Sequence, residues 1–132
     1  MIIRSMLPQD TSSIERILSE SGSFKQPYIR EQFTYVVCEI EGRVVGVGSY
    51  TQNDGFIQQL GVPSNQQGKG IGSALMQHLE DKIRKHCSSV NVHSTAEQIK
   101  FYISKGYEHA SLLPNPTGLF PLTKIFAYQS TY

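Results

Sequence analysis

Short runs of apolar and β-branched residues, separated by turn-forming residues, recur along the chain and predict its strands. Glu41 and Gly42 lie between two such runs and form a favourable turn pair, so residues 35–51 are predicted to be a β-hairpin. The other predicted strands cover residues 1–6, 56–62, 89–94, 107–113 and 119–129.

Apolar residues at the spacing of a helix predict further elements between these strands. The predicted helices cover residues 10–21, 25–33, 71–83 and 96–106. Ser12 and Glu15 have the spacing of a capping box at the start of the first helix, and Gly106 is expected to end the last. The longest helix has one apolar face, made of Ile71, Ala74, Leu75, Leu79 and Ile83.

The predicted elements follow the order β-α-α-β-β-β-α-β-α-β-β. This order differs from a uniform repeat of βαβ units, and it predicts a mixed α/β (α+β) fold in which helices flank a sheet. The 132 residues contain no internal repeat, low-complexity tract or linker, and this length is sufficient for one buried core. We therefore expect residues 1–132 to form a single domain.

Composition and charge narrow the class of protein. Hydrophobic residues make up 39% of the chain and charged residues 17%, which is typical of a globular domain. The 12 basic and 11 acidic residues give a net charge of +1, so no basic excess supports binding to nucleic acid or to a membrane surface. No apolar run approaches the ~20 residues of a membrane span, and the first ten residues lack the apolar region of a signal peptide.

The chain has two cysteines, Cys38 and Cys87, which lie far apart and outside any metal-ligand spacing. Free cysteines are usually buried structural residues, and disulfides are rare in the cytoplasm. We interpret both as reduced thiols, and we expect a cytoplasmic protein without a bound metal.

Three glycines within five positions, Gly68, Gly70 and Gly72, stand where the longest predicted helix begins. Glycine at this point disfavours order, so its use there indicates that the backbone must be exposed. The free N–H groups and the dipole of a helix start attract anions, which makes phosphate binding the first hypothesis.

Two common phosphate-binding motifs do not fit these residues. A P-loop requires Ser or Thr after the lysine and an earlier glycine, but Gly70 follows Lys69 and Pro63 occupies the glycine position. Gly68, Gly70 and Ser73 match the dinucleotide fingerprint only loosely, and no acidic residue ends the next strand. A helix start that merely contains glycines remains the simplest alternative.

A third motif fits. Residues 67–72, QGKGIG, match the Q/R-x-x-G-x-G/A acetyl-CoA loop of the GNAT superfamily of N-acetyltransferases. Residues 101–107, FYISKGY, are similar to the F-Y-x-x-x-G-F/Y helix end of that family, and the strand order agrees. The chain therefore resembles a GNAT domain over almost its whole length. The resemblance implies a mixed, mostly antiparallel sheet and acetyl-CoA as co-substrate.

The resemblance also implies where CoA would bind. Backbone amides of the loop can point at the pyrophosphate without side chains in the way, and the expected contacts are Gln67, Gly68, Lys69, Gly70, Ile71, Gly72 and Ser73. Pantetheine resembles a peptide and would add to the strand edge at Leu60, Gly61 and Val62, where Gly61 would permit close approach or a bulge. Thr95 stands where many members carry an asparagine that contacts the cofactor.

Acetyl transfer from a thioester requires a neutral amine, a stabilised oxyanion and a proton for the leaving thiolate. By resemblance, the amide of Val62 would meet the oxyanion and Tyr102 would protonate the sulfur. A phenol with an ordinary pKa of ~10 is protonated at pH 7 and can serve as this donor. Helical spacing alone would favour Tyr102 as a packing residue.

The general base is less apparent in the sequence. Histone-modifying members of the family carry a glutamate in the strand before the loop, and Phe56 occupies that position here. Gln58 and Gln59 cannot act as bases, although they could orient a water or the substrate, or fill polar positions on the strand. His93, at the end of a predicted strand, is the candidate base, because an imidazole has a reference pKa of ~6.5. A structural histidine is the alternative.

Residues 21–33 and 112–121 are expected to shape the acceptor pocket, and they contain no acidic cluster that would select a polyamine or aminoglycoside. We therefore predict direct transfer of an acetyl group to a primary amine of a small molecule or peptide. A non-catalytic acyl-CoA-binding regulatory module is the alternative. A homodimer formed through the final strands is compatible with the sequence and is not required by it.

Overall fold

The computed structural model describes residues 1–21 and 29–126. Its strands are β1 (Ile2–Ser5), β2 (Thr34–Ile40), β3 (Arg43–Thr51), β4 (Phe56–Gly61), β5 (Ser89–Ser94), β6 (Glu108–His109) and β7 (Phe120–Ile125). Its α-helices are α1 (Thr11–Glu20), α2 (Ile71–Arg84) and α3 (Ile99–Ser104). Three short 3₁₀ turns occupy Pro8–Asp10, Ser64–Gln66 and Ala96–Gln98.

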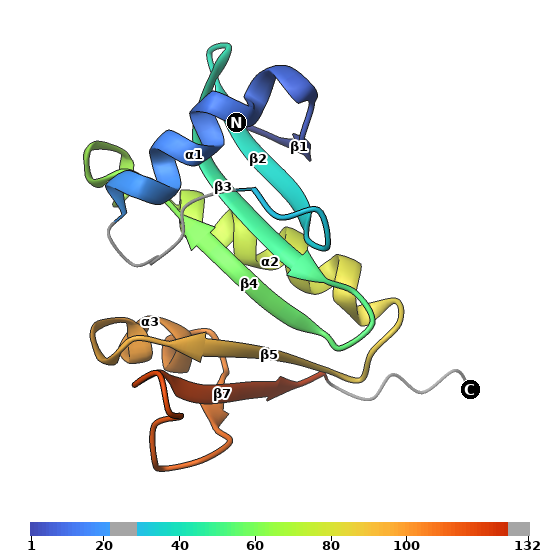
Figure 1. Ribbon diagram of the computed structural model, residues 1–132, viewed down its shortest axis with the longest axis vertical. Helices are drawn as coiled ribbons and strands as arrows, with labels where there is room; N and C mark the ends of the chain where they lie inside the picture. Colours follow the sequence, from blue (N-terminus) through green and yellow to red (C-terminus); the bar gives the residue numbers. More distant parts are fainter. Residues whose placement is uncertain (22–28, 127–132) are drawn as a thin grey trace.

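The strands form one sheet in the order β1-β2-β3-β4-β5-β7-β6 (Figure 1). All neighbouring pairs are antiparallel except β4 and β5, which run parallel. The predicted mixed, mostly antiparallel sheet with flanking helices is therefore confirmed. β4 and β5 pair at a single register position, Phe56 opposite Asn91, and then diverge toward their carboxyl ends (Figure 1).

Two apolar clusters hold the helices on opposite faces of this sheet (Figure 1). On one face, α1 buries Ile14, Ile17 and Leu18 against residues of β2 and β3. On the other face, α2 buries a stripe against the sheet. This stripe consists of Ile71, Leu75, Leu79 and Ile83, which confirms the periodicity seen in the sequence. No helix among the described residues is long and apolar enough to cross a bilayer.

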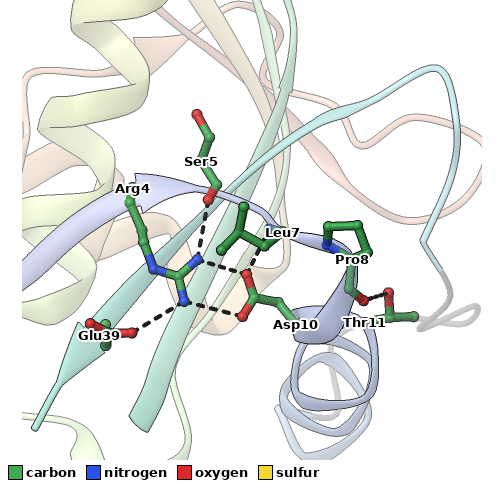
Figure 2. A network of polar contacts seen from close by, with 7 residues as sticks. All are labelled: Arg4, Ser5, Leu7, Pro8, Asp10, Thr11 and Glu39. Atoms are coloured by element: carbon green, nitrogen blue, oxygen red, sulfur yellow. Dashed lines mark hydrogen bonds and ion pairs between the residues drawn. The ribbon is translucent and has the colours of Figure 1, made fainter. Parts of the chain in front are cut away.

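An ion-pair network ties the first strand to the start of α1 (Figure 2). The Arg4 guanidinium donates to both carboxylate oxygens of Asp10, at 2.7 and 3.1 Å, and to Glu39 of β2 at 3.2 Å. The backbone N–H of Leu7 also donates to Asp10, at 2.7 Å. Arg4 and these donors hold the pKa of the buried Asp10 carboxyl below its usual value, because they favour the charged form.

The predicted hairpin is confirmed, with Glu41 and Gly42 at φ 51° and 77° in the turn. The predicted capping box is wrong. α1 begins at Thr11, so Ser12 already lies inside the helix, and the chain enters it through the turn fixed by Asp10. A bulge in β4 lies at Gln58 rather than at Gly61, since Ser49 pairs with Gln59 and Tyr50 with Ile57.

Three predicted elements differ from the structure. The helix expected over 25–33 is absent from 29–33, where Phe33 N–H bonds the carbonyl of Arg30 in a turn, and 25–28 lie outside the described residues. The strand expected over 107–113 is shorter in the structure and is limited to β6, Glu108–His109. The segment that follows is a turn, because the Asn115 side chain accepts hydrogen bonds from the amides of Thr117 and Leu119. The strand predicted over 119–129 is observed as β7, and residues 127–129 of that prediction lie outside the described residues.

Candidate active site

Two neighbouring clefts contain the predicted site residues, and the larger of these two, about 440 Å³, lies between the glycine loop, the end of β4 and helix α3. It brings together Leu60, Val62, Gln67, Gly68, Gly70, Ile71, Gly72, Ser73 and Tyr102 from the residues predicted by sequence. These residues come from three segments separated by up to about forty positions. The fold therefore brings residues of both sequence motifs into the lining of one cleft.

The glycine loop presents open backbone to this cleft. Gly68 and Gly70 have φ of 83° and 79°, a region that side chains disfavour, and a Cβ added at either would meet nothing within 4 Å. Gln67 stabilises the loop by donating from Nε2 to the carbonyl of Val62 at 3.1 Å. The exposed Lys69 donates to Gln66 Oε1 at 3.0 Å. The loop thus has the space and the free amides that an anion requires.

A smaller cleft of about 170 Å³ lies where β4 and β5 diverge. Its lining residues are Phe56, Ile57, Gln58, Gln59, Leu60, His93, Thr95, Gln98, Tyr102 and Leu119. Leu60, Gln98 and Tyr102 line both clefts, so the two cavities meet along one wall. None of the lining residues described for either cleft is acidic.

Tyr102 lies at this junction. Its ring packs edge to face on Phe101 and Tyr107, with centroids 5.3 and 5.5 Å away. Burial raises the pKa of the Tyr102 hydroxyl to about 12, since the phenolate would be poorly solvated. The hydroxyl therefore keeps its proton at physiological pH.

The chain fixes α3, and with it Tyr102, by two devices. Gly106 at φ 94° ends the helix, and the N–H of Tyr107 returns to the carbonyl of Tyr102 at 3.1 Å in a Schellman motif, as the sequence predicted for Gly106. The Tyr107 hydroxyl donates to the buried Glu80 of α2 at 2.7 Å, and Lys124 of β7 bonds the same carboxylate at 2.9 Å. Burial and this carboxylate raise the pKa of Tyr107.

The structure separates other predicted site residues from the larger cleft. Gly61 faces α1, where an added Cβ would lie 3.3 Å from Ile17, so its close approach serves helix packing. His93 is exposed at the end of β5 and lines the smaller cleft, as does Thr95. Lys69 lies on the loop but outside the lining.

Several cleft residues lie outside the motifs recognised in the sequence. Gln98 lines both cavities and precedes Tyr102 by four positions, a spacing that places both on one helix face and could have identified it. Phe101 faces Gly72, where an added Cβ would lie 3.8 Å from its ring. Ser21, at the end of α1, reaches the larger cleft through tertiary packing alone, for which the sequence gives no local signal.

A family model described as an acetyltransferase (GNAT) domain matches residues 8–116 of the chain. An uncharacterised N-acetyltransferase of Methanocaldococcus jannaschii is 32% identical over 130 residues, covering 86% of this chain and 82% of the relative. The match therefore extends over both cleft-forming motifs.

Solved structures show the same fold. Ard1 from Thermoplasma volcanium superposes with a TM-score of 0.78 at 23% identity, covering 96% of this chain and 98% of its own. PaiA N-acetyltransferase from Thermoplasma acidophilum, solved in complex with coenzyme A, has a TM-score of 0.78 at 13% identity, covering 95% and 98%. At these low sequence identities the similarity shows a shared fold and nothing more.

Proposed function

The chain belongs to the GNAT family of acetyltransferases, and we propose that its 132 residues act as one domain that transfers the acetyl group of acetyl-CoA directly to a primary amine. The observation that carries this proposal is the junction of two clefts at Tyr102. One cleft begins at an anion-binding loop and the other is a separate cavity, so two substrates can meet along a common wall. The described lining residues of both clefts come from a single chain.

The residues of the larger cleft fit acetyl-CoA. Gly68 and Gly70 leave room for a pyrophosphate against the loop amides, and no side chain blocks them. Among the described residues, the edge of β4 that faces β5 has no strand partner beyond Phe56, so residues 60–62 can bond a peptide-like pantetheine. Acetyl-CoA, when bound, supplies the thioester. We assign Thr95 and Lys69 only peripheral contacts, since neither lines this cleft.

We propose that Tyr102 stabilises the departing sulfur by donating a hydrogen bond. A thiol has an ordinary pKa of about 8.5, so a phenol with a pKa of about 12 remains protonated beside a thiolate. Tyr102 therefore acts as a donor as negative charge develops, and full protonation of the thiolate comes from solvent or from the amine. The amide of Val62, at the end of β4, is the proposed oxyanion donor.

His93 is the proposed general base. It lies in the smaller cleft, where the amine would enter, and no lining residue described for that cleft is a carboxylate that could take its place. Its exposed imidazole can pass a proton to solvent, directly or through water. We place the reaction in the cytoplasm, since Cys38 and Cys87 are free thiols.

The test is release of free CoA from acetyl-CoA, followed with a thiol reagent across a panel of small primary amines and short peptides. We expect amine-dependent release that yields an equal amount of the acetylated amine. Tight CoA binding without turnover on any amine would contradict transfer and would leave a non-catalytic acyl-CoA-binding module.

A further inference from the structure

Gln58 and Gln59 are consecutive residues of β4 that both line the smaller cleft. Successive residues of a regular strand point to opposite faces, so only one of them would normally do so. The bulge at Gln58 breaks this alternation and gives both amides access to one cavity.

The protein fixes one end of the Gln58 amide. The Thr51 hydroxyl donates its proton to the Asp54 carboxylate and therefore acts as an acceptor toward Gln58. Nε2 of Gln58 donates to Thr51 Oγ1 at 3.1 Å. The carbonyl oxygen of this side chain bonds no residue in the described part of the chain, so it remains an acceptor for a ligand.

In Gln59 the protein fixes the oxygen end of the side-chain amide. The Tyr35 hydroxyl accepts the backbone N–H of Arg30 at 3.1 Å and donates to Gln59 Oε1 at 2.8 Å. The Ser49 hydroxyl donates to the same oxygen at 3.1 Å, which occupies both of its lone-pair directions. The nitrogen end makes no hydrogen bond to a described residue, although Gln59 is only 6% exposed.

No fully buried side-chain polar atom among the described residues lacks a hydrogen-bond partner. The Gln59 nitrogen must therefore keep some solvent access, and we infer that it has this access from the smaller cleft, which Gln59 lines. The cavity thus holds one fixed amide donor and one fixed amide acceptor, with no carboxylate among its described lining residues.

We propose that this glutamine pair recognises an aminoacyl group, that is, an amine with a carbonyl on the neighbouring carbon. Gln58 Oε1 accepts an N–H of the amine, and Gln59 Nε2 donates to the carbonyl oxygen. Polyamines are disfavoured, because they offer no carbonyl to Gln59 and would need carboxylates for their other charges. This inference rests on the proposed function and narrows its acceptor to amino-acid amides and peptide amino termini.

The test compares alaninamide with isopropylamine, which differ only by replacement of the carboxamide with a methyl group. Since the carbonyl lowers the pKa of the amine, kcat/KM is expressed per neutral amine. We expect alaninamide to be preferred about tenfold or more, because isopropylamine leaves the Gln59 donor unpaired. A peptide amide that begins with alanine then distinguishes a small-molecule acceptor from a peptide one.

Gln59→Glu keeps an oxygen that accepts from Tyr35 and Ser49 but removes the N–H donors. We expect it to abolish the preference, whereas Gln52→Glu, the same change at an exposed turn residue, should retain it. If Gln59→Glu does not fold, product inhibition of the unmodified enzyme can be used instead to compare a ligand that carries the carbonyl with one that lacks it. N-acetylalaninamide should then inhibit about tenfold more strongly than N-isopropylacetamide.

Equal use of both amines, or a preference that survives in Gln59→Glu, would overturn this inference while leaving the proposed function intact. Acetylation of no amine at all would overturn the proposed function and the inference with it. A preference that is lost in Gln59→Glu and kept in Gln52→Glu supports both.

Discussion

The rings of Phe56 on β4 and His93 on β5 meet edge to face, with centroids 5.0 Å apart and an interplanar angle of 65°. This contact bridges the two parallel strands just beyond their single register pair, so it lies where the smaller cleft opens. By resemblance, Phe56 occupies the position at which histone-modifying members carry a glutamate. The aromatic contact therefore orients the His93 imidazole against the residue that replaces that glutamate.

Replacement of His93 by alanine should lower kcat/KM at neutral pH by about a hundredfold or more, because general bases contribute on this scale. With kcat/KM expressed per neutral amine, the parent should also lose activity as the pH falls, since a protonated imidazole cannot accept the amine proton, and this loss should disappear in the variant. Steady-state kinetics across pH measure both effects. His86→Ala, at an exposed histidine after α2, is the control and should behave like the parent. An unchanged pH profile in His93→Ala would assign His93 a structural role.

Removal of the Tyr102 hydroxyl in Tyr102→Phe should lower kcat by roughly a hundredfold while CoA affinity stays within a few-fold of the parent. The hydroxyl acts mainly in the transition state, because a thioester sulfur is a weak acceptor beforehand. The ring contacts with Phe101 and Tyr107 are kept, so the melting temperature should hardly change. Single-turnover kinetics and calorimetry with CoA separate these quantities. Parental turnover in Tyr102→Phe would show that the residue only packs.

At the glycine loop, Gly70→Asp and Gly70→Asn form a matched pair, since both place a side chain of the same shape at φ 79°. Only Asp adds a negative charge beside the pyrophosphate. Gly70→Asp should bind CoA at least about fivefold more weakly than Gly70→Asn, and the difference should shrink at high salt. Calorimetry at two ionic strengths measures both effects. If both variants fold and bind CoA with equal affinity, the pyrophosphate does not bind at this loop.

The Arg4–Asp10 pair should make stability depend on pH (Figure 2). Because the pKa of Asp10 is lowered in the folded state, its contribution is present above the ordinary carboxyl pKa of ~3.9. That contribution is lost as the pH falls through the lowered value. Asp10→Asn should cost about 1–3 kcal/mol of unfolding free energy at pH 7, and the difference from the parent should vanish in acid. Urea unfolding at pH 7 and at a series of lower pH values that extends below the lowered pKa of Asp10 tests this, and a constant difference would contradict it.

Local sequence determined most of the elements. Ile71, Leu75, Leu79 and Ile83 recur at helical spacing whatever surrounds them, and a Glu-Gly pair turns a hairpin by its own backbone preferences. The acetyl-CoA loop and the FY…GY helix end are identified instead by their resemblance to family motifs, and only the glycines at the helix start and Gly106 follow from local preference. The helix predicted over 25–33 failed at 29–33, because Phe33 packs against the α1 cluster and leads into β2.

The sites depended on tertiary structure. The smaller cleft opens where β4 diverges from β5. Its lining includes Thr95 and His93, and neither of these lines the larger cleft beside the glycine loop. The orientation of Gln59 is set by Tyr35 and Ser49, 24 and 10 positions away. The sequence by itself determined the backbone pattern and both motifs, because these follow from local conformational preference. Only the fold decided which side chains share a cavity and which amide ends stay free, because hydrogen-bond partners come from residues far apart in the chain.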